Sequence, residues 1–562
     1  MNASTWAQTL VSTLAACGVR QVCLSPGARS APLAIACEAH PDIETLLIID
    51  ERSAAFFAVG LARATGAPVA LVCSSGTAGA NYHPAVVEAS MSGLPLIVLT
   101  ADRPARLHGL GAPQTIDQQA LFGGAVRRFV SLPEASPQPQ ARRALARQVA
   151  MAVASALGPE PGPVHLNCPF DEPLTGPVES EAGVAPRVHA ARPLAGQGAL
   201  EAVAARLQAA RRPLLIAGPD AGRHGAAPAL LALAEALAMP VVADVGSGLR
   251  GEETCAFADL FLRLPAFHEA PPDMVLLAGG APTAKGVLTY LQGLAPGTIA
   301  LQPDARPHDA EALADCVVIG DVADAVRRLT AMVETPAPAS WLARWREADR
   351  RAEAIVNAPE TPVPFEARAV RAAIAALPTD AALCLSNSLP IRHADTFGGR
   401  LRPGISVHVY RGANGIDGVT SMSLGVARGL GRPTLLVTGD LAFMHDLGGL
   451  AAARHLAGPM VVLLLNNDGG GIFSYLPLAS ATPRFEELFG TPHGLSFGPA
   501  AALFGLGYAR ATSVSEIEAA VRQGLGAPGL TVIEVPSERS ETVASFKACA
   551  AAVAEALSEV TA

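Results

Sequence analysis

Short apolar runs recur along the chain, and most of them are hydrophobic at every position rather than at alternate positions. Examples are "LPLIVLTA", "TLLVTGD" and "MVVLLLNN", which are separated by longer segments rich in Ala and Leu. Strands that are apolar on both faces are buried on both faces, and this requires helices above and below a parallel sheet. The pattern therefore predicts an α/β fold with right-handed crossover connections.

The length of 562 residues exceeds what one hydrophobic core can organise, so several domains are expected. Two polar, Pro-containing seams, at 176–196 and 334–367, divide the chain into parts of similar size. We predict three doubly wound parallel-sheet domains, over 1–180, 190–333 and 360–562.

Charge and cysteine content limit the classes of function. The net charge of −9 is spread along the chain without acidic or basic blocks, which argues against nucleic-acid and polybasic membrane binding and favours small-molecule partners. The nine cysteines are odd in number and form no C-x-x-C pair, as expected in a reducing cytoplasm. No run approaches the roughly 20 apolar residues of a membrane span, so a cytoplasmic protein is predicted.

Residues 438–473, "TGDLAFMHDLGGLAAARHLAGPMVVLLLNNDGGGIF", place polar residues at the ends of two apolar runs. Neighbouring parallel strands end at the same edge of a sheet, so Asp440 and Asn467 are expected near one another. With the Gly469 carbonyl they would supply three hard oxygen ligands, which suit Mg²⁺ bound to a diphosphate, with Mn²⁺ as a substitute. Taken separately, Gly-Asp at a strand end and Asn-Asn before a glycine turn are each more often ordinary structural features.

The 27-residue spacing from Asp440 to Asn467 matches the thiamine diphosphate motif. Together with "LSPGARSAPL", "DERSAAFFAVGLA", "CSSGTAGANYHPAVVEA", "LTADRPARL", "GAPQTIDQ", "VHLNCPFDEPL", "SNSLPIR" and "YRGANGIDG", it makes the chain resemble the 2-succinyl-5-enolpyruvyl-6-hydroxy-3-cyclohexene-1-carboxylate synthases of menaquinone biosynthesis. The resemblance implies pyrimidine-binding, central and diphosphate-binding domains. It also implies a homodimer at least, or a homotetramer, with the cofactor held between subunits.

The resemblance assigns the cofactor contacts. Glu51 is the carboxylate that hydrogen-bonds the aminopyrimidine ring, although an ion pair with Arg52 or Arg63 is the alternative for this residue in isolation. Ile416 is the apolar wedge that bends the cofactor. The remaining implied cofactor-binding residues are Ser388, Gly439, Asp440, Asn467 and Ile472.

The implied substrates, 2-oxoglutarate and isochorismate, are both dianions, and Arg suits carboxylates through its bidentate fork. The catalytic and substrate-binding candidates implied by the matching motifs are Arg29, Gln114, Arg392, Arg411, Arg103, Asn387 and, in the central domain, Lys285. Ala28 and Gly286 depart from residues that some relatives carry, a hydroxyl and a basic group respectively, which puts single substrate contacts in doubt.

The implied function is a transferase reaction: decarboxylation of 2-oxoglutarate and conjugate addition of the resulting succinyl unit to isochorismate. Two alternatives stay open, another thiamine diphosphate-dependent 2-oxo acid decarboxylase or carboligase, and a non-catalytic nucleotide-binding protein with decayed sites. The G-x-G-x-x-G match at Gly246, Gly248 and Gly251 has no acidic residue at the spacing of a dinucleotide site, so we interpret it as a plain loop.

Overall fold

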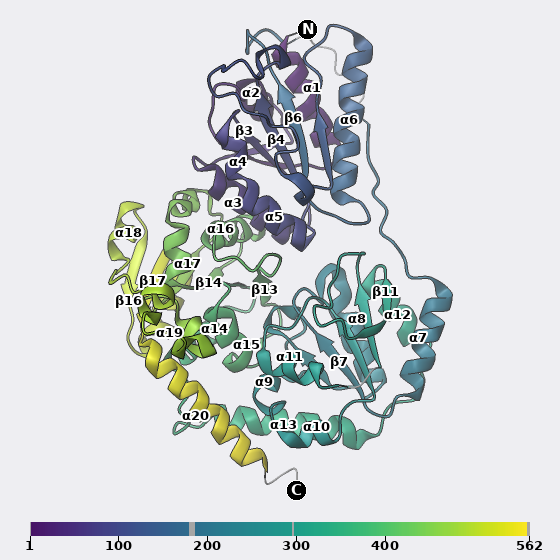
Figure 1. Cartoon of the computed structure of the whole chain (residues 1–562), viewed down its shortest axis with the longest axis vertical. Helices are drawn as coiled ribbons and strands as arrows, with labels where there is room; N and C mark the ends of the chain where they lie inside the picture. The colour runs from purple at the N-terminus through teal and green to yellow at the C-terminus, as the bar shows by residue number, and fades with distance from the viewer. Residues whose placement is uncertain (1, 179–185, 295–296, 559–562) are drawn as a thin grey trace. The chain divides into compact units, whose positions relative to one another are not determined.

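A computed structural model describes residues 2–178, 186–294 and 297–558 (Figure 1). It contains three all-parallel sheets, of six, five and six strands, with helices in the crossovers, which confirms the predicted α/β fold. Two compact units are present: residues 1–191, 412–432 and 442–458 form the first, and the remainder forms the second. The predicted domain boundaries stay a prediction, and part of the first seam, 179–185, lies outside the described residues.

The first unit contains a sheet of order β2-β1-β3-β4-β6-β5. Its strands are β1 (Gln21–Leu24), β2 (Glu44–Leu47), β3 (Val69–Cys73), β4 (Leu96–Asp102), β5 (Arg128–Ser131) and β6 (Val164–Pro169). Its main helices are α1 (Ala3–Ala16), α2 (Ala31–Glu38), α3 (Glu51–Thr65), α4 (Thr77–Asn81), α5 (His83–Ser92) and α6 (Pro139–Leu157). Apolar side chains of α1, α2 and α6 form one core cluster with the strands, and α3 packs on α5.

Helix α16 (Val419–Leu430) also belongs to the first unit and packs closely along α3. The contact depends on glycine on both helices. A Cβ on Gly60 would lie 1.9 Å from the Met422 carbonyl oxygen, and one on Gly425 would lie 2.0 Å from the Phe57 carbonyl oxygen. A larger residue at either position would force the two backbones apart.

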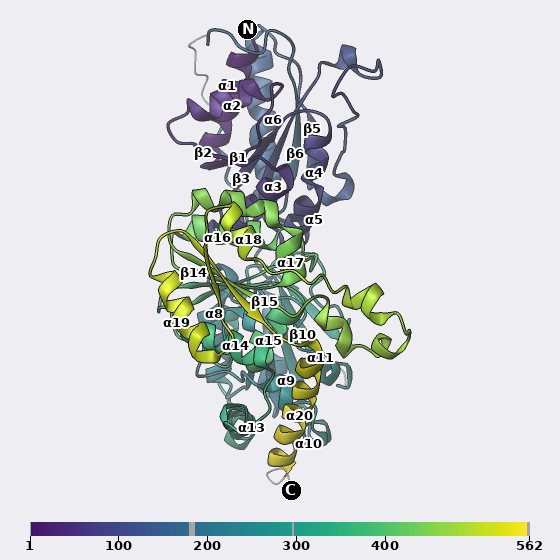
Figure 2. The same cartoon turned by 90° about the vertical axis from the view of Figure 1, so that its left-hand side faces the viewer.

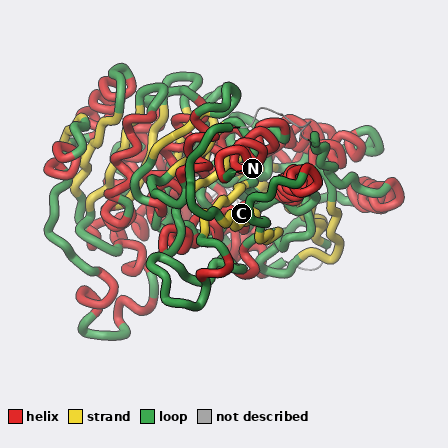
Figure 3. Tube along the Cα trace, turned by 90° about the horizontal axis from the view of Figure 1, so that it is seen from above, coloured by secondary structure: helices red, strands yellow, loops and turns green. Residues whose placement is uncertain are grey.

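The second unit contains the central sheet, of order β11-β10-β9-β7-β8. Its strands are β7 (Pro213–Ala217), β8 (Val241–Ala243), β9 (Met274–Ala278), β10 (Thr298–Gln302) and β11 (Ala314–Ile319). The helices of this part are α7 (Gln197–Ala209), α8 (Ala226–Ala236), α9 (Ala258–Phe261), α10 (Pro265–Glu269), α11 (Lys285–Gln292), α12 (Val322–Thr330) and α13 (Ala339–Asn357). Figure 3 shows the strands of the chain flanked by helices and loops.

The third sheet, also in the second unit, has the order β13-β12-β14-β15-β17-β16. Its strands β14 and β15 are labelled in Figure 2. Its strands are β12 (Ala382–Leu385), β13 (Ser406–Val409), β14 (Thr434–Gly439), β15 (Met460–Asn466), β16 (Gly507–Arg510) and β17 (Leu530–Pro536). The associated helices are α14 (Phe365–Ala375), α15 (Leu389–Phe397), α18 (Gly498–Leu503), α19 (Val514–Leu525) and α20 (Arg539–Ser558). Helix α17 (Asp440–His445) follows β14, and its residues from Ala442 onward belong to the first unit. Among the described residues, no helix combines the length and apolarity needed to cross a membrane.

The structure differs from the expected crossover after β14 in one detail. The segment is helical, but it divides into the short α17 and a 3-10 stretch, Leu447–His455. Asp446 lies between the two, and its carboxylate accepts hydrogen bonds from the Ser421 amide at 2.7 Å and the Ser421 hydroxyl at 3.0 Å. The Asp446 carboxylate thus satisfies an amide in the first turn of α16.

Candidate active site

The carboxyl ends of β14 and β15 hold the predicted metal ligands. These strands are adjacent and parallel, with Gly439 opposite Leu465, so Asp440 and Asn467 leave the sheet at the same edge. Both residues are buried, at 2% and 8% exposure. Asp440 Oδ2 accepts a hydrogen bond from the Gly469 amide at 2.8 Å, which ties the two loops together.

The Asn467 amide has one satisfied end and one unsatisfied end. Its Nδ2 donates to Glu366 Oε1 at 3.0 Å, whereas its Oδ1 has no hydrogen-bond partner among the described residues. A buried acceptor without a donor is costly unless something else satisfies it. An amide oxygen beside a carboxylate suits a hard divalent cation, so the donor set fits Mg²⁺.

Gly469 has a φ of +130°, and a Cβ there would lie 1.9 Å from the Gly490 carbonyl oxygen, so only glycine fits. Its amide faces Asp440, and its carbonyl accepts from the Gly471 amide at 3.0 Å. Asp468 also adopts positive φ, at 59°, which is uncommon for a residue with a side chain. Such strain is typical of loops shaped for a ligand.

His493 is a residue of this edge that sequence analysis missed. Its Nε2 lies 3.2 Å from Asp440 Oδ2, and its side chain is 9% exposed. Burial raises the pKa of Asp440, and the hydrogen bonds from Gly469, Leu441 and His493 oppose this rise. The sequence around His493, "GTPHGL", carries no spacing signal that could have identified it.

Glu366 contacts Asn467, and His393 contacts Glu366; the sequence did not predict either residue. Glu366, in the first turn of α14, is 0% exposed, and its Oε2 lies 2.9 Å from His393 Nε2. Burial by itself would raise the pKa of Glu366, but His393, Ser537 and Asn467 together hold it below its ordinary value. The carboxylate is therefore held in its charged form.

The ends of β12 and β13 carry the predicted residues Asn387, Ser388, Arg392 and Arg411. Asn387 Nδ2 donates to the Tyr410 carbonyl at 2.8 Å, and Arg411 Nη1 donates to Asn387 Oδ1 at 3.3 Å. Ser388 precedes α15 with a φ of 72°, and its carbonyl accepts from Arg392 at 2.7 Å. Burial and the nearby Arg411 lower the pKa of Arg392, so two cations lie close together. Clustered, part-buried arginines suit a dianionic ligand.

A second group of predicted residues lies at the carboxyl edge of the first sheet. Arg103 directly follows β4 and donates to Ser75 Oγ at 2.6 Å. Gln114, with a φ of 56°, donates to Ser74 Oγ at 3.3 Å and to the Ser75 carbonyl at 3.0 Å. Burial and the nearby Arg29 lower the pKa of Arg103. Arg103 and Gln114 thus both contact one Ser-Ser turn, and Arg29 lies near Arg103.

Arg29 is fixed by the end of β6 and the loop that follows it. It donates to the Phe170 carbonyl at 3.0 Å and pairs with Glu172 at 3.2 Å. The preceding loop approaches the Ser-Ser turn so closely that a Cβ on Gly27 would lie 2.3 Å from Ser74 Cβ. The glycine of "SPGARS" is therefore required for packing.

Glu51 is the first residue of α3, and Asp50 caps this helix by accepting from the Ser53 amide at 3.1 Å. Within the described part of the chain, the Glu51 carboxylate has neither a hydrogen-bond nor an ion-pair partner. The alternative pairing with Arg52 or Arg63 is not seen: Arg52 donates to the His445 carbonyl and Arg63 to Ser92 Oγ. The carboxylate is available for a ligand.

Ile416 lies half-buried in a glycine-containing loop of the first unit. Glu88 of α5, which sequence analysis did not identify, accepts from the Gly412 amide at 3.1 Å and the Ala413 amide at 2.6 Å. This buried carboxylate fixes the start of the loop that carries Ile416. In the second unit, Gly439 ends β14, and Ile472 lies half-buried in a 3-10 turn over Gly471–Tyr475.

The central sheet carries only Lys285 of the predicted residues, exposed at the start of α11. A Cβ on Gly286 would lie 2.5 Å from the Asp259 carbonyl oxygen, so this departure from relatives has a packing reason. In the G-x-G-x-x-G loop, Asp244 accepts from the Gly246 amide at 2.7 Å and from the Thr283 amide at 2.7 Å. The Gly246 amide of this loop is therefore not available to an anion, which agrees with a plain loop.

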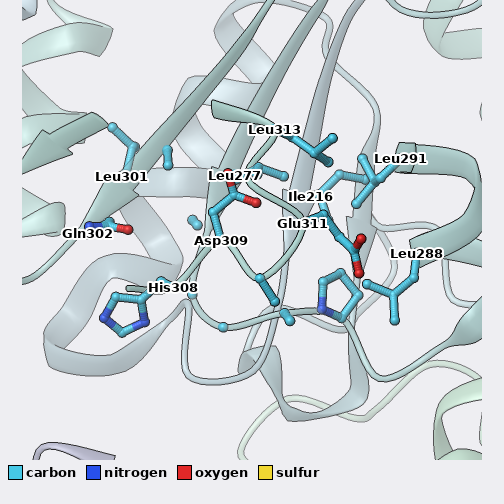
Figure 4. A pocket seen from close by; sticks show the side chains of 17 residues that line it. Ile216, Leu277, Leu288, Leu291, Leu301, Gln302, His308, Asp309, Glu311 and Leu313 are labelled. Carbon is cyan, nitrogen blue, oxygen red and sulfur yellow. The ribbon is translucent and has the colours of Figure 1, made fainter. Parts of the chain in front are cut away.

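A hollow in the central sheet is lined by apolar side chains and by the acidic residues Asp309 and Glu311 (Figure 4). Its acidic groups bond within the chain: Asp309 accepts from the Ala314 amide, and Glu311 accepts from Gln292. No cluster of three or more His, Cys, Asp or Glu residues suited to a metal occurs in the described ranges. The proposed cation therefore depends on the mixed oxygen set of Asp440 and Asn467.

Comparison with known proteins agrees with this geometry. Residues 4–121 match the family described as "Thiamine pyrophosphate enzyme, N-terminal TPP binding domain", and residues 407–535 match the corresponding C-terminal TPP binding domain. The chain is 39% identical to 2-succinyl-5-enolpyruvyl-6-hydroxy-3-cyclohexene-1-carboxylate synthase of Halobacterium salinarum, over 95% of each chain. It is 40% identical to the same enzyme of Chloroflexus aurantiacus, over 99% of this chain and 97% of that one.

Among solved structures, benzoylformate decarboxylase from Polynucleobacter necessarius superposes with a TM-score of 0.76. The match covers 96% of this chain and 99% of that one at 17% identity. At this identity the likeness shows the fold alone.

Proposed function

Because this chain belongs to the 2-succinyl-5-enolpyruvyl-6-hydroxy-3-cyclohexene-1-carboxylate synthase family of thiamine diphosphate enzymes, we propose that its site releases CO₂ from 2-oxoglutarate and adds the remaining succinyl unit to isochorismate. The enzyme is a transferase of menaquinone biosynthesis. The observation that carries the assignment of the site is the unsatisfied Asn467 Oδ1 at the sheet edge that also carries Asp440.

Asp440, Asn467 and the Gly469 carbonyl would hold Mg²⁺, or Mn²⁺ in its place, with diphosphate oxygens and water completing the shell. Gly439 and Ile472 would contact the cofactor from the same edge. The cofactor, when bound, supplies an electron sink for the carbon that loses CO₂. The protein supplies orientation and charge.

Glu51 is proposed to hydrogen-bond the pyrimidine ring and so to control the proton on its amino group. Its place at the start of α3 favours a carboxylate, and it has no competing partner among the described residues. Ile416, held in its loop through Glu88, is the proposed wedge beneath the ring, and Ser388 is a further proposed cofactor contact.

Substrate charge would be met by arginines at both sheet edges. Arg392 and Arg411, with Asn387, form one group, and Arg29 and Arg103, with Gln114, form the other. Each group can pair with carboxylates bidentately. Lys285 lies apart on the central sheet, and its proposed substrate contact rests on the sequence alone.

We also propose a homodimer as the smallest active form, with a tetramer as the alternative, and a cytoplasmic location. The family resemblance supports the dimer. The described cysteines are all free thiols, as expected in a reducing compartment.

The decisive assay incubates the protein with thiamine diphosphate, Mg²⁺ and 2-oxoglutarate, with and without isochorismate, and follows CO₂ and isochorismate together. We expect CO₂ release that depends on isochorismate and falls about 100-fold or more in Glu51→Gln, because proton transfer contributes this much. Equal CO₂ release without isochorismate would instead favour a simple decarboxylase. Absence of cofactor binding would favour a non-catalytic protein.

A further inference from the structure

Glu366 is a fully buried carboxylate that neither sequence motif nor family comparison assigned. It lies in the first turn of α14 and accepts hydrogen bonds from side chains of four separate segments. Its partners are His393 of α15, Asn467 after β15, Ser537 after β17 and Thr542 of α20. These hydrogen-bond donors compensate the free-energy cost of burying the carboxylate charge.

The two oxygens of Glu366 have different partners. Oε2 faces His393 Nε2 at 2.9 Å, while Oε1 accepts from Asn467 Nδ2 at 3.0 Å and from Ser537 Oγ at 2.7 Å. An ionised carboxylate can only accept. Rotating the Asn467 amide by half a turn would place its oxygen against that carboxylate, so the observed orientation is the only favourable one.

The space beside the Asn467 amide is tight. A Cβ on Gly471 would lie 2.8 Å from Asn467 Nδ2 and 3.0 Å from Leu389 Cδ1, so no side chain fits on that side. Because Nδ2 donates to Glu366, the unsatisfied Oδ1 faces away from it. Metal ligands are commonly oriented by such an outer partner, and losing the partner weakens metal binding.

We propose that Glu366 is a positioning residue for the metal site: it fixes the Asn467 amide so that Oδ1 is presented as a ligand, and through His393 it joins the metal loop to helix α15, which carries Arg392. This inference rests on the proposed function, because it assumes that Asn467 binds the cation. Glu366 does not touch the cation or substrate in this role.

A purely structural ion pair between Glu366 and His393 is the competing explanation. It predicts a loss of stability on substitution but no specific link between positions 366 and 467. The positioning role predicts such a link, since Asn467→Asp places a carboxylate 3.0 Å from a second carboxylate. Replacing Glu366 by Gln in that background restores a donor between the two side chains.

The test is a double-mutant cycle on the full-length protein with thiamine diphosphate present, using Mn²⁺ as the probe and electron paramagnetic resonance of the bound ion as the readout. We expect Glu366→Ala to weaken Mn²⁺ binding about 10- to 100-fold. Glu366→Gln, which can still accept from Asn467, should stay within about threefold of the wild type. The double variant Asn467→Asp with Glu366→Gln should bind Mn²⁺ about tenfold more tightly than the single variant Asn467→Asp.

Ser537→Ala is the matched control, because it removes a donor to the same Oε1 and leaves the Asn467 contact in place. Its Mn²⁺ affinity should stay within about twofold of the wild type. Additive effects in the cycle would overturn the proposal, and they remain measurable even if Glu366→Ala fails to fold. If the wild type binds no Mn²⁺ with the cofactor present, the metal assignment itself is overturned.

Discussion

The first and third sheets have the same strand order but different chemistry at their carboxyl edges. Counted within each sheet, the order is 2-1-3-4-6-5 in both. In the first sheet the third strand, β3, is followed by Ser74 and the fourth, β4, by Arg103. In the third sheet the same two strands, β14 and β15, are followed by Asp440 and Asn467.

Equivalent positions therefore carry a hydroxyl and a cation in one sheet, and a carboxylate and an amide in the other. The shared topology determines where functional side chains gather, because both pairs of strands end at the edge where backbone groups are unpaired. The residue after each strand determines what can bind there. The first edge suits anionic substrates, and the third suits a hard cation.

The largest expected effect tests the two equivalent positions directly. Asp440→Ala should lower kcat/KM by about 10³-fold, or about 4 kcal/mol, because it removes the only carboxylate proposed to bind the cation. Ser74→Ala should lower it by only about three- to tenfold, since its hydroxyl accepts one long hydrogen bond from Gln114. Steady-state kinetics with Mg²⁺ titration would measure both, and equal losses would show that the two edges do not differ as proposed.

A smaller effect is expected at the cationic edge. Arg103→Met should lower kcat/KM about 10- to 100-fold for the dianionic substrates, mainly through KM, because it removes a part-buried charge that can pair with a carboxylate. Arg106→Met is the matched control. Its guanidinium pairs with Asp171 on the surface, and its kcat/KM should change less than about twofold. Similar losses in both variants would assign the effect to net charge alone.

The fold could be predicted where strands are buried on both faces. The runs that became β3, β4, β14 and β15 are largely apolar and almost fully buried, and they were identified from the sequence. The edge strands β5, β11, β13 and β16 were not, because their side chains are largely exposed or half-buried. Partial exposure admits polar residues and removes the apolar signal.

The shared sheet edge of Asp440 and Asn467 could be predicted because each residue directly follows a strand, whereas Arg103 was implied by the family resemblance alone. Glu366, His493 and Glu88 were not predictable, because each comes from a distant segment and acts by contacting a loop that carries a predicted residue. No motif surrounds Glu366 or His493, and Glu88 lies within "CSSGTAGANYHPAVVEA", which gives no sign of its contact with a distant loop. Such long-range contacts follow from tertiary packing and leave no local pattern in the sequence.

Two buried carboxylates extend the contrast between the units to stability. Asp446, in the first unit, is fully buried with serine donors, and burial raises its pKa to about 6 despite them. Glu366, in the second unit, is equally buried, but its donors, led by His393, hold its pKa below the ordinary value. Burying the Asp446 charge therefore has a net free-energy cost, whereas the hydrogen-bond donors of Glu366 compensate the cost of burying its charge.

The smallest expected effect is on folding stability. Neutralising Asp446 and neutralising Glu366 should change the free energy of unfolding at pH 8 in opposite directions. Because the pKa of Asp446 is raised, the contribution of this group to folding stability is greatest below about pH 4 and is lost as the pH rises through about 6. We therefore expect Asp446→Asn to stabilise the protein at pH 8 by about 1–3 kcal/mol and to have little effect near pH 4. For a lowered pKa, the contribution exists above the ordinary Glu value and is lost as the pH falls below it, so Glu366→Gln should destabilise at pH 8. Thermal unfolding between pH 4 and 8 measures both. Destabilisation by both variants at pH 8 would contradict the contrast, because it would mean that serine donors compensate a buried charge as well as a histidine does.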